Sequence, residues 1–182
     1  MKMLAKIITT ISVAAVLATS ASAFEPVKKA YFGVGAQSTN LDFKNGGDYD
    51  STQYALRWGM FKVFSNRLYL GWNMQLDIGT VEDLKNDEGK DSKIVTFGGQ
   101  LEAGYRVPKL ETDVYAILAG KYGGIEDTDI AGFGYGIGVG KDLWNWGRIM
   151  VEYKKFSMSV DNVLLDSYDE NNVGVYFAFT FK

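Results

Sequence analysis

Residues 172–182 read NVGVYFAFTFK, and the strict alternation of this stretch decides the fold. Apolar side chains take every second position: Val173, Val175, Phe177, Phe179 and Phe181. The positions between them are Asn172, Gly174, Tyr176, Ala178 and Thr180. Because successive side chains of a strand point to opposite faces, this pattern predicts a strand with one wholly apolar face. An open edge of this kind aggregates in water, so we expect the strand to close a barrel whose apolar face meets lipid.

Seven further stretches alternate in the same way, so the sequence predicts eight strands. The other seven are residues 29–41, 51–64, 67–79, 93–107, 112–123, 130–143 and 148–159. In the stretch 148–159 the alternation is expected to slip near Lys155 and Phe156, at a bulge. Short connections (65–66, 108–111 and 144–147) alternate with mostly longer ones (42–50, 80–92, 124–129 and 160–170). This arrangement predicts an all-β fold, an eight-stranded antiparallel up-and-down transmembrane β-barrel.

Side-chain size indicates which face of the predicted barrel is outside. A soluble, lipocalin-like barrel also has eight strands, with its apolar side chains inside. Here the apolar face carries Trp58, Trp72 and Phe97 besides the phenylalanines of the last strand, and these would overfill so narrow an interior. The opposite face of the stretch 130–143 carries only glycine from position 132 to 140. We therefore expect a lipid-facing apolar surface, with glycines that leave room for large polar side chains or for a lumen cavity.

Seven charged residues fall on the predicted inner face. They are Arg57, Asp77, Glu102, Arg106, Lys121, Glu152 and Lys154. Because a buried unpaired charge is costly, we expect these groups to form ion pairs and hydrogen bonds across the lumen. Such a polar network either plugs the barrel or forms a gate in a narrow ion path, and the sequence does not assign its partners.

The first 23 residues predict a cleavable signal peptide. Lys2 and Lys6 precede a mostly apolar stretch at 7–17, and residues 21–23 read ASA, the small-x-small form of a cleavage site. The predicted barrel domain is then 24–182. Without Lys2 and Lys6 the chain has 17 basic and 22 acidic residues, a balance of −5, and no basic patch that suggests nucleic acid.

The charges are expected to be polarised along the barrel. The longer connections hold most acidic residues, among them Glu170. The opposite rim is expected to carry Lys28, Lys29, Arg67, Lys109, Lys141, Arg148 and Lys182. Divalent-cation ligands are conceivable at Asp127 with Asp129, or at Asp87, Glu88 and Asp91, but the 12-residue calcium-loop pattern is missing and a solvated acidic surface is favoured. Aromatic residues near strand ends (Tyr54, Phe64, Tyr122, Trp144 and Trp146) fit interfacial girdles.

Together these features resemble the small eight-stranded outer-membrane barrels of Gram-negative bacteria, the group of outer-membrane protein A (its transmembrane domain), outer-membrane protein X and the opacity-type adhesins. The resemblance covers 29–181 and includes the terminal pattern of Gly174, Phe177, Phe179 and Phe181. It implies that the barrel-assembly machinery reads this last strand as an assembly signal. Here Lys182 follows the final aromatic residue, which departs from the family pattern. The resemblance also implies a monomer in contact with outer-membrane lipid and lipopolysaccharide.

Three functions agree with this fold. The first is a non-enzymatic structural or adhesin-like barrel that acts through acidic extracellular loops, and the second is a narrow porin-like channel for ions or very small solutes. The third, an enzyme that acts on membrane lipid or peptide, is disfavoured because the chain has no histidine to serve as a general base. Cysteine is absent as well, and we expect no catalytic residue, cofactor or metal.

Overall fold

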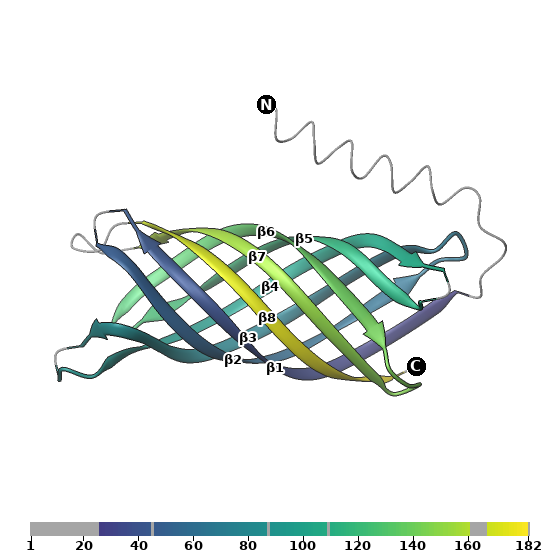
Figure 1. The fold of residues 1–182 in the computed structure, drawn as a ribbon, viewed down its shortest axis with the longest axis horizontal. Coiled ribbons are helices and arrows are strands. Elements are labelled where there is room, and N and C mark those ends of the chain that lie inside the picture. Colours follow the sequence, from purple (N-terminus) through teal and green to yellow (C-terminus); the bar gives the residue numbers. More distant parts are fainter. Residues whose placement is uncertain (1–25, 45, 87, 109, 161–166, 182) are drawn as a thin grey trace, which may run out of the picture.

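The computed structural model describes residues 26–181 apart from 45, 87, 109 and 161–166, and it consists of eight strands (Figure 1). The predicted signal peptide lies outside the described residues. The strands are β1 (Val27–Phe43), β2 (Gly47–Val63), β3 (Leu68–Lys85), β4 (Asp91–Val107), β5 (Thr112–Ile125), β6 (Thr128–Asp142), β7 (Gly147–Val160) and β8 (Tyr168–Phe181). No helix among the described residues has the length and apolarity needed to cross a membrane.

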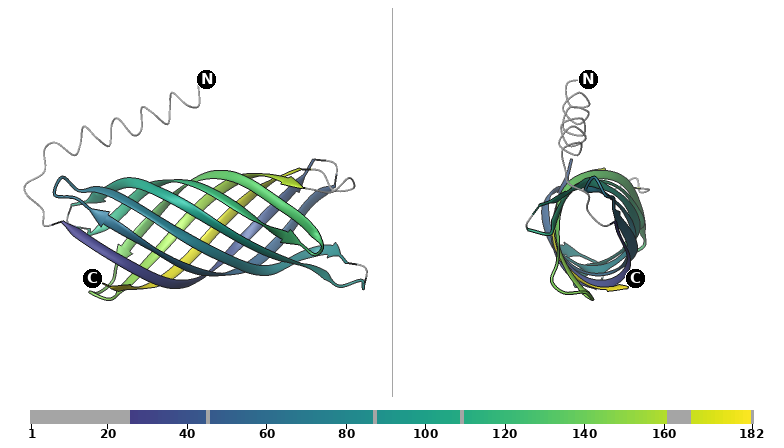
Figure 2. Two further views of the ribbon diagram at one scale, coloured as in Figure 1. Left: turned by 180° about the vertical axis from the view of Figure 1, so that it is seen from behind. Right: turned by 90° about the vertical axis from the view of Figure 1, so that its right-hand side faces the viewer.

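The eight strands form one closed antiparallel barrel in chain order, which confirms the predicted fold. Closure is made by β1 and β8, where Ala30 pairs with Phe181 and Phe43 with Tyr168. The end-on view in Figure 2 shows the strands closing into a ring. A path across the strands that starts at Lys29 returns to β1 at Thr39, so the register shifts by ten residues around the barrel. Eight strands enclose an interior that side chains can just fill.

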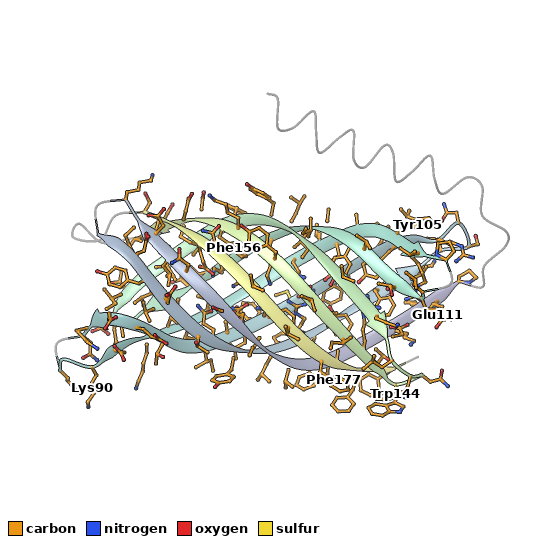
Figure 3. All side chains as sticks on the ribbon, viewed as in Figure 1. Lys90, Tyr105, Glu111, Trp144, Phe156 and Phe177 are labelled. Atoms are coloured by element: carbon orange, nitrogen blue, oxygen red, sulfur yellow. The ribbon has the colours of Figure 1, made fainter. Side chains whose placement is uncertain are left out.

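The two rims differ in what they carry. Both described chain ends lie at one rim, named here the termini rim, together with the strand ends Val63, Leu68, Val107, Thr112, Asp142 and Gly147. The strand ends Phe43, Gly47, Lys85, Asp91, Ile125, Thr128, Val160 and Tyr168 lie at the other, the loop rim. Lys90 and Glu111 mark these opposite ends in Figure 3. The connections at the loop rim are shorter than predicted because the paired strands continue through most of the stretches expected to be loops.

The inner and outer faces follow the predicted alternation. Trp58, Trp72 and Phe97 are exposed on the outside, whereas Arg57, Asn73 and Thr96 beside them in sequence are buried. Hydrophobic side chains therefore cover the outer surface and polar ones fill much of the lumen. This arrangement is the reverse of a soluble barrel and suits a lipid environment.

Aromatic side chains gather near both ends of the apolar surface. At the termini rim Trp144 stacks on Trp146, and Trp146 stacks on Phe179, with ring centroids 5.2 and 5.8 Å apart. Figure 3 shows Trp144 close to Phe177 at this end. Toward the loop rim, Tyr54 and Tyr122 are 69% and 58% exposed. These positions fit the interfacial girdles predicted from sequence.

The bulge expected in β7 is absent. The β7–β8 register runs without interruption through Phe156, which pairs with Glu170. Phe156 and Met158 keep the inward parity of Glu152 and are buried. In the sequence these two residues looked out of phase because apolar side chains were expected to face lipid. In the structure both side chains lie inside the lumen. The register shift that does occur lies in β3, between Val81 and Lys85.

The glycines of β6 make room for side chains of neighbouring strands. A Cβ atom at Gly138 would collide with the Tyr115 ring, one at Gly134 with Phe156, and one at Gly140 with the Arg148 guanidinium. Large inward side chains thus occupy the space beside β6. Room for large side chains was expected and is found, but these side chains come from the neighbouring strands β5 and β7 and include the apolar ring of Phe156. They occupy the space that the alternative, a glycine-lined lumen cavity, would need.

We predict that Gly138→Val lowers the free energy of unfolding by about 1–3 kcal/mol, because the added Cβ displaces the Tyr115 ring in a filled lumen. Ala131→Val, on the outer face of the same strand, is the matched control and should change little. The measurement is urea unfolding of the barrel in detergent, with heat-modified gel mobility as the probe of folding. Equal stabilities of the two variants would mean that the lumen beside β6 is not filled.

Candidate functional site

The lumen is arranged in layers, and β7 passes through all of them. From the termini rim its buried side chains are Arg148, Met150, Glu152, Lys154, Phe156 and Met158. Arg148 belongs to an ion cluster at the termini rim, and Met150 to an apolar cluster that also contains Phe61 and Tyr69. Glu152 and Lys154 belong to the central network, defined by the contacts below. Phe156 and Met158 belong to a second apolar cluster, at the loop rim.

The centre of the network is the pair of Arg57 on β2 and Glu152 on β7. Both side chains are fully buried, and two guanidinium N–H groups donate to the two carboxylate oxygens at 2.7 Å each. The Arg57 guanidinium also donates to Gln75 Oε1 and lies 3.6 Å from the centroid of the Tyr176 ring. A two-pronged contact of this kind fixes the orientation of both groups and is among the stronger hydrogen-bond types.

Other inward residues complete the surroundings of Glu152. Lys154 Nζ lies 3.3 Å from Glu152 Oε2, and the Tyr115 hydroxyl donates to Oε1 at 3.0 Å. Gln100 Nε2 donates to the same oxygen at 3.2 Å and to Glu102 Oε1 at 2.8 Å. The Gln100 amide therefore bridges the two glutamates, and β2, β4, β5 and β7 are joined through one carboxylate.

Glu102 and Asp77 have neutral partners, contrary to the expected ion pairs. Glu102 accepts hydrogen bonds from the Tyr69 hydroxyl, from Asn73 at 2.7 Å and from Gln100. Asp77 accepts from Gln75 at 2.6 Å and from Thr96 at 3.3 Å. No ion pair between the described residues includes either carboxylate. Neutral donors on the same strand (Gln75 for Asp77, Gln100 for Glu102) and on the paired neighbouring strand (Thr96 for Asp77, Tyr69 and Asn73 for Glu102) satisfy these oxygens.

A second group of charges, the termini-rim ion cluster, contains Arg106. The Arg106 guanidinium donates to both oxygens of Asp113 at 2.7 and 2.8 Å. Arg148 donates to Asp113 at 2.7 Å and to Asp142 at 2.9 Å, and Lys29 lies 3.3 Å from Asp142. Arg148 is fully buried, with its guanidinium 4.3 Å from the Phe61 centroid. Lys29 and Arg148 thus lie inside the lumen, not on the rim surface where the sequence placed them.

Lys121 lies closer to the loop rim, where it meets Glu170. Its ammonium contacts both carboxylate oxygens of Glu170 and lies 4.6 Å from the Phe156 ring centroid. Glu170 was expected in a loop but is fully buried on β8. Beyond this pair, the loop-rim apolar cluster closes the lumen with Leu41, Phe43, Val81, Ile94, Ile125, Ile130, Phe156, Met158 and Tyr168.

All seven charged residues that the sequence placed on the inner face are buried, but they form three groups. Arg57, Glu152 and Lys154 meet in the central network beside Glu102 and Asp77. Arg106 lies in the termini-rim ion cluster, and Lys121 pairs separately with Glu170. Sequence reasoning missed Lys29, Asp113, Asp142, Arg148 and Glu170, although each has the inward parity of its strand. Extending the alternation to the strand ends would have found them.

The lumen contains equal numbers of cationic and anionic side chains, held in place by ion pairs and hydrogen bonds. Within the described part of the chain, six cations (Lys29, Arg57, Arg106, Lys121, Arg148 and Lys154) accompany six carboxylates (Asp77, Glu102, Asp113, Asp142, Glu152 and Glu170). No group of three or more potential metal ligands comes together among these residues. The arrangement can hold the strands in one register and block the bore.

The residues of the predicted assembly signal lie on the two faces of β8. Phe179 and Phe181 are exposed on the outer face, and Phe177 contacts Phe179 with ring centroids 5.3 Å apart. Gly174 points inward, where a Cβ atom would meet the Tyr176 side chain. The backbone N–H of Thr180 donates to the Trp146 carbonyl at 2.8 Å. The terminal aromatic residues are thus held against the last turn of the termini rim.

Comparison with known proteins gives a family and a fold. Residues 11–181 match the family model described as the outer membrane protein beta-barrel domain. Two solved structures are similar, Neisserial surface protein A (TM-score 0.58) and the attachment invasion locus protein Ail of Yersinia pestis (TM-score 0.57), the latter in complex with the heparin analogue sucrose octasulfate. Both are 12% identical to this chain. The first match covers 84% of this chain and 97% of the other, and the second covers 85% and 99%. No curated protein matches in sequence.

We predict that Glu152→Gln lowers the free energy of unfolding by about 3–5 kcal/mol, because it leaves the buried Arg57 guanidinium facing a neutral amide. Glu102→Gln is the matched control: the same change in a buried glutamate whose partners are neutral. Its amide oxygen can still accept from Asn73 and Gln100, and its amide group can donate to the Tyr69 hydroxyl, so we expect a loss of about 1 kcal/mol. Denaturant unfolding of the refolded barrel measures both, and similar losses would contradict this distinction.

Proposed function

Because this chain belongs to the outer membrane protein beta-barrel domain family and is a protein of the bacterial outer membrane, we propose that it acts as a closed, non-enzymatic surface barrel. In this proposal the lumen is structural, and the loop rim meets an external partner in an adhesin-like way. The observation that carries the proposal is the filling of the bore: the central network is enclosed between the termini-rim and loop-rim apolar clusters.

The proposal places the loop rim outside the cell. Both described chain ends lie at the termini rim (Figure 1), and in outer-membrane barrels of even strand number the short turns face the periplasm. The strands continue beyond the aromatic belt at the loop rim, so their polar ends project from the membrane. Contacts between loop-rim carboxylates and the anionic headgroups of lipopolysaccharide, bridged by divalent cations, are part of the same proposal. So is recognition of the β8 aromatic residues by the barrel-assembly machinery. The barrel is proposed to act as a monomer.

Charge at the loop rim suggests the kind of partner. Ten exposed carboxylates project there among the described residues: Asp42, Asp48, Asp50, Glu82, Asp83, Glu88, Asp91, Glu126, Asp127 and Asp129. Four exposed lysines accompany them: Lys44, Lys85, Lys90 and Lys93. The Lys85 ammonium donates a hydrogen bond to the Asp91 carboxylate, which lowers the pKa of that carboxyl. A field of this sign attracts cationic partners and repels polyanions.

The negative charge of the loop rim argues against assigning to this chain the ligand seen in the Ail structure. The Ail structure contains a sulfated, negatively charged heparin analogue. At 12% identity the similarity to Ail shows the fold alone, and the acidic loop rim of this chain is unsuited to such a ligand. We therefore propose a cationic partner surface, such as a basic protein segment.

A narrow channel for ions or very small solutes is the second candidate. It is favoured by the polar central network, which spans several strands at mid-barrel. Conduction would require the Arg57–Glu152 pair to separate and both apolar clusters to open. The surface role needs neither change, and for that reason it is the leading proposal.

We predict that the refolded protein in detergent binds polylysine in a salt-sensitive way and does not bind heparin. A variant with Asp48, Asp50, Glu82, Asp83 and Asp129 changed to the corresponding amides should lose at least about tenfold in polylysine affinity, because exposed charge provides the attraction. The matched control changes buried Glu102 to glutamine, which leaves the rim charge intact. Surface plasmon resonance at two salt concentrations measures the binding. Binding of heparin by the wild type, or an unchanged polylysine affinity in the five-residue variant, would refute the proposed partner chemistry.

A further inference from the structure

The termini rim carries an excess of positive charge. Seven cations lie there among the described residues: Lys28, Lys29, Lys62, Arg67, Arg106, Lys141 and Arg148. Three carboxylates of the described chain accompany them: Glu111, Asp113 and Asp142. The sign is opposite to that of the loop rim, and a field of this sign attracts anions.

Part of this excess lies inside the lumen, in the termini-rim ion cluster. Three cations meet two carboxylates there: Lys29, Arg106 and Arg148 with Asp113 and Asp142. The central network has the opposite imbalance, with two cations and three carboxylates. No ion pair between the described residues joins the two groups, and the apolar cluster that contains Phe61 and Met150 lies between them. The ion cluster is therefore one anion short of local neutrality.

Lys29 and Arg106 have N–H groups to spare at the mouth of the lumen. Lys29 Nζ and Arg106 Nη2 each lie 3.3 Å from the same oxygen, Asp142 Oδ2. Within the described part of the chain this is the one hydrogen bond of the Lys29 ammonium, and Arg106 Nη1 has no hydrogen-bond partner there. Asp142 and Lys29 reach the surface, with 12% and 8% of their side chains exposed. Charge-assisted hydrogen bonds are usually shorter than 3.3 Å, so these two cations can bind a further anion.

Two exposed lysines lie beside this mouth in an unfavourable arrangement. Lys28 and Lys62 are direct partners across β1 and β2, and both side chains lie on the outer face. Like charges directly opposite each other destabilise a sheet. The Lys62 ammonium lies 4.5 Å from the centroid of the Phe64 ring, which keeps it at the rim. The pair adds positive potential next to Lys29.

We propose that the termini rim binds a phosphate group, held by Lys29 and Arg106 at the mouth of the lumen. Guanidinium and ammonium groups are the usual partners of phosphate oxygens, and a phosphate supplies the negative charge that the ion cluster lacks. It offers more oxygens than a carboxylate, so it can contact both cations while Asp142 stays in place. With the loop rim outside the cell, the phosphate belongs to a soluble periplasmic compound or to a phospholipid headgroup of the inner leaflet. The assignment does not use the proposed cationic partner of the loop rim.

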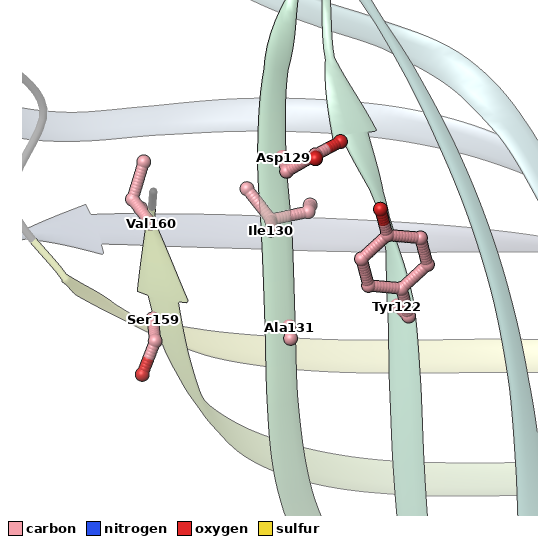
Figure 4. A pocket seen from close by; sticks show the side chains of 6 residues that line it. All are labelled: Tyr122, Asp129, Ile130, Ala131, Ser159 and Val160. Atoms are coloured by element: carbon pink, nitrogen blue, oxygen red, sulfur yellow. The ribbon is translucent and has the colours of Figure 1, made fainter. Parts of the chain in front are cut away.

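A hollow near the loop rim has the opposite chemistry. Its lining includes Tyr122, Asp129 and Ser159, and Figure 4 shows the Tyr122 hydroxyl on the same side as the Asp129 carboxylate. Asp129 is the charged side chain of this lining, so a phosphate group would meet a carboxylate there and be repelled. The charge of the two ends therefore favours the termini rim for an anionic ligand.

The test is isothermal titration calorimetry of the refolded full barrel in detergent with inorganic phosphate at constant ionic strength. We expect the wild type to bind one phosphate per barrel. Lys29→Gln removes a charged donor from the site and should weaken binding by at least about tenfold. The matched control is Lys28→Gln, which removes the same charge from the outer face one residue away and should weaken binding by less than about threefold. Asp142→Asn removes the carboxylate that competes for Lys29 and Arg106, so it should strengthen binding, whereas a merely structural defect would weaken it.

Native mass spectrometry with phosphatidylglycerol separates the two sources of phosphate. One lipid retained by the wild type and released by Lys29→Gln would assign the site to a phospholipid headgroup, and phosphate binding without lipid retention would assign it to a soluble compound. No saturable phosphate binding by the wild type would overturn the proposal, as would equal weakening by Lys28→Gln and Lys29→Gln. Heat-modified gel mobility verifies that each variant is folded. Lys29→Arg keeps the charge and should still bind phosphate, so a failure of Lys29→Gln to fold does not prevent the test.

Discussion

The structure depends on compensating buried charge inside a bore that large side chains occupy. A charge in such a place needs an opposite charge or several hydrogen bonds in good geometry, and removing one member of an ion pair leaves the other buried and uncompensated. Arg57 and Glu152 meet this requirement from β2 and β7, on different sides of the lumen. Lys154, Tyr115 and Gln100 converge on the same carboxylate, so the pair links strands that share no backbone hydrogen bonds. The contact therefore joins β2 and β7 across the bore, in addition to the backbone pairing of neighbouring strands.

The sequence contains the strand pattern of this barrel but little of its cross-lumen geometry. Alternation gives the face on which a side chain lies, so it predicted eight strands and the inward position of Arg57, Glu102 and Glu152. It gives no height or distance across the bore, so it could not show that Glu102 meets neutral donors while Glu152 meets Arg57. Partners across the lumen depend on the shift of ten residues in register around the barrel, which no local pattern records.

The errors at the strand ends have two physical causes. Hydropathy marks only the part of each strand that faces lipid, whereas the paired strands extend beyond it toward the loop rim, so Glu170 looked like a loop residue although it is buried. At the other end Lys29 and Arg148 looked like rim charges because their position at a strand end was given more weight than their inward parity. Phe156 looked out of phase because apolar side chains also close the lumen from inside. The glycines of β6 give room to the side chains of Tyr115 and Arg148, which the sequence could not identify as the occupants of that space.

The molecule thus has an interior of paired charge and apolar clusters and two outward surfaces, an acidic rim and an apolar wall. That division rests on the claim that the lumen is closed. The most direct test is single-channel conductance of the refolded wild type in a planar bilayer, with a heat-modifiability gel to verify insertion of a closed barrel. A folded, electrically silent barrel is the predicted result. Discrete, salt-dependent openings would contradict the account and would mean that the Arg57–Glu152 pair separates to open an ion path.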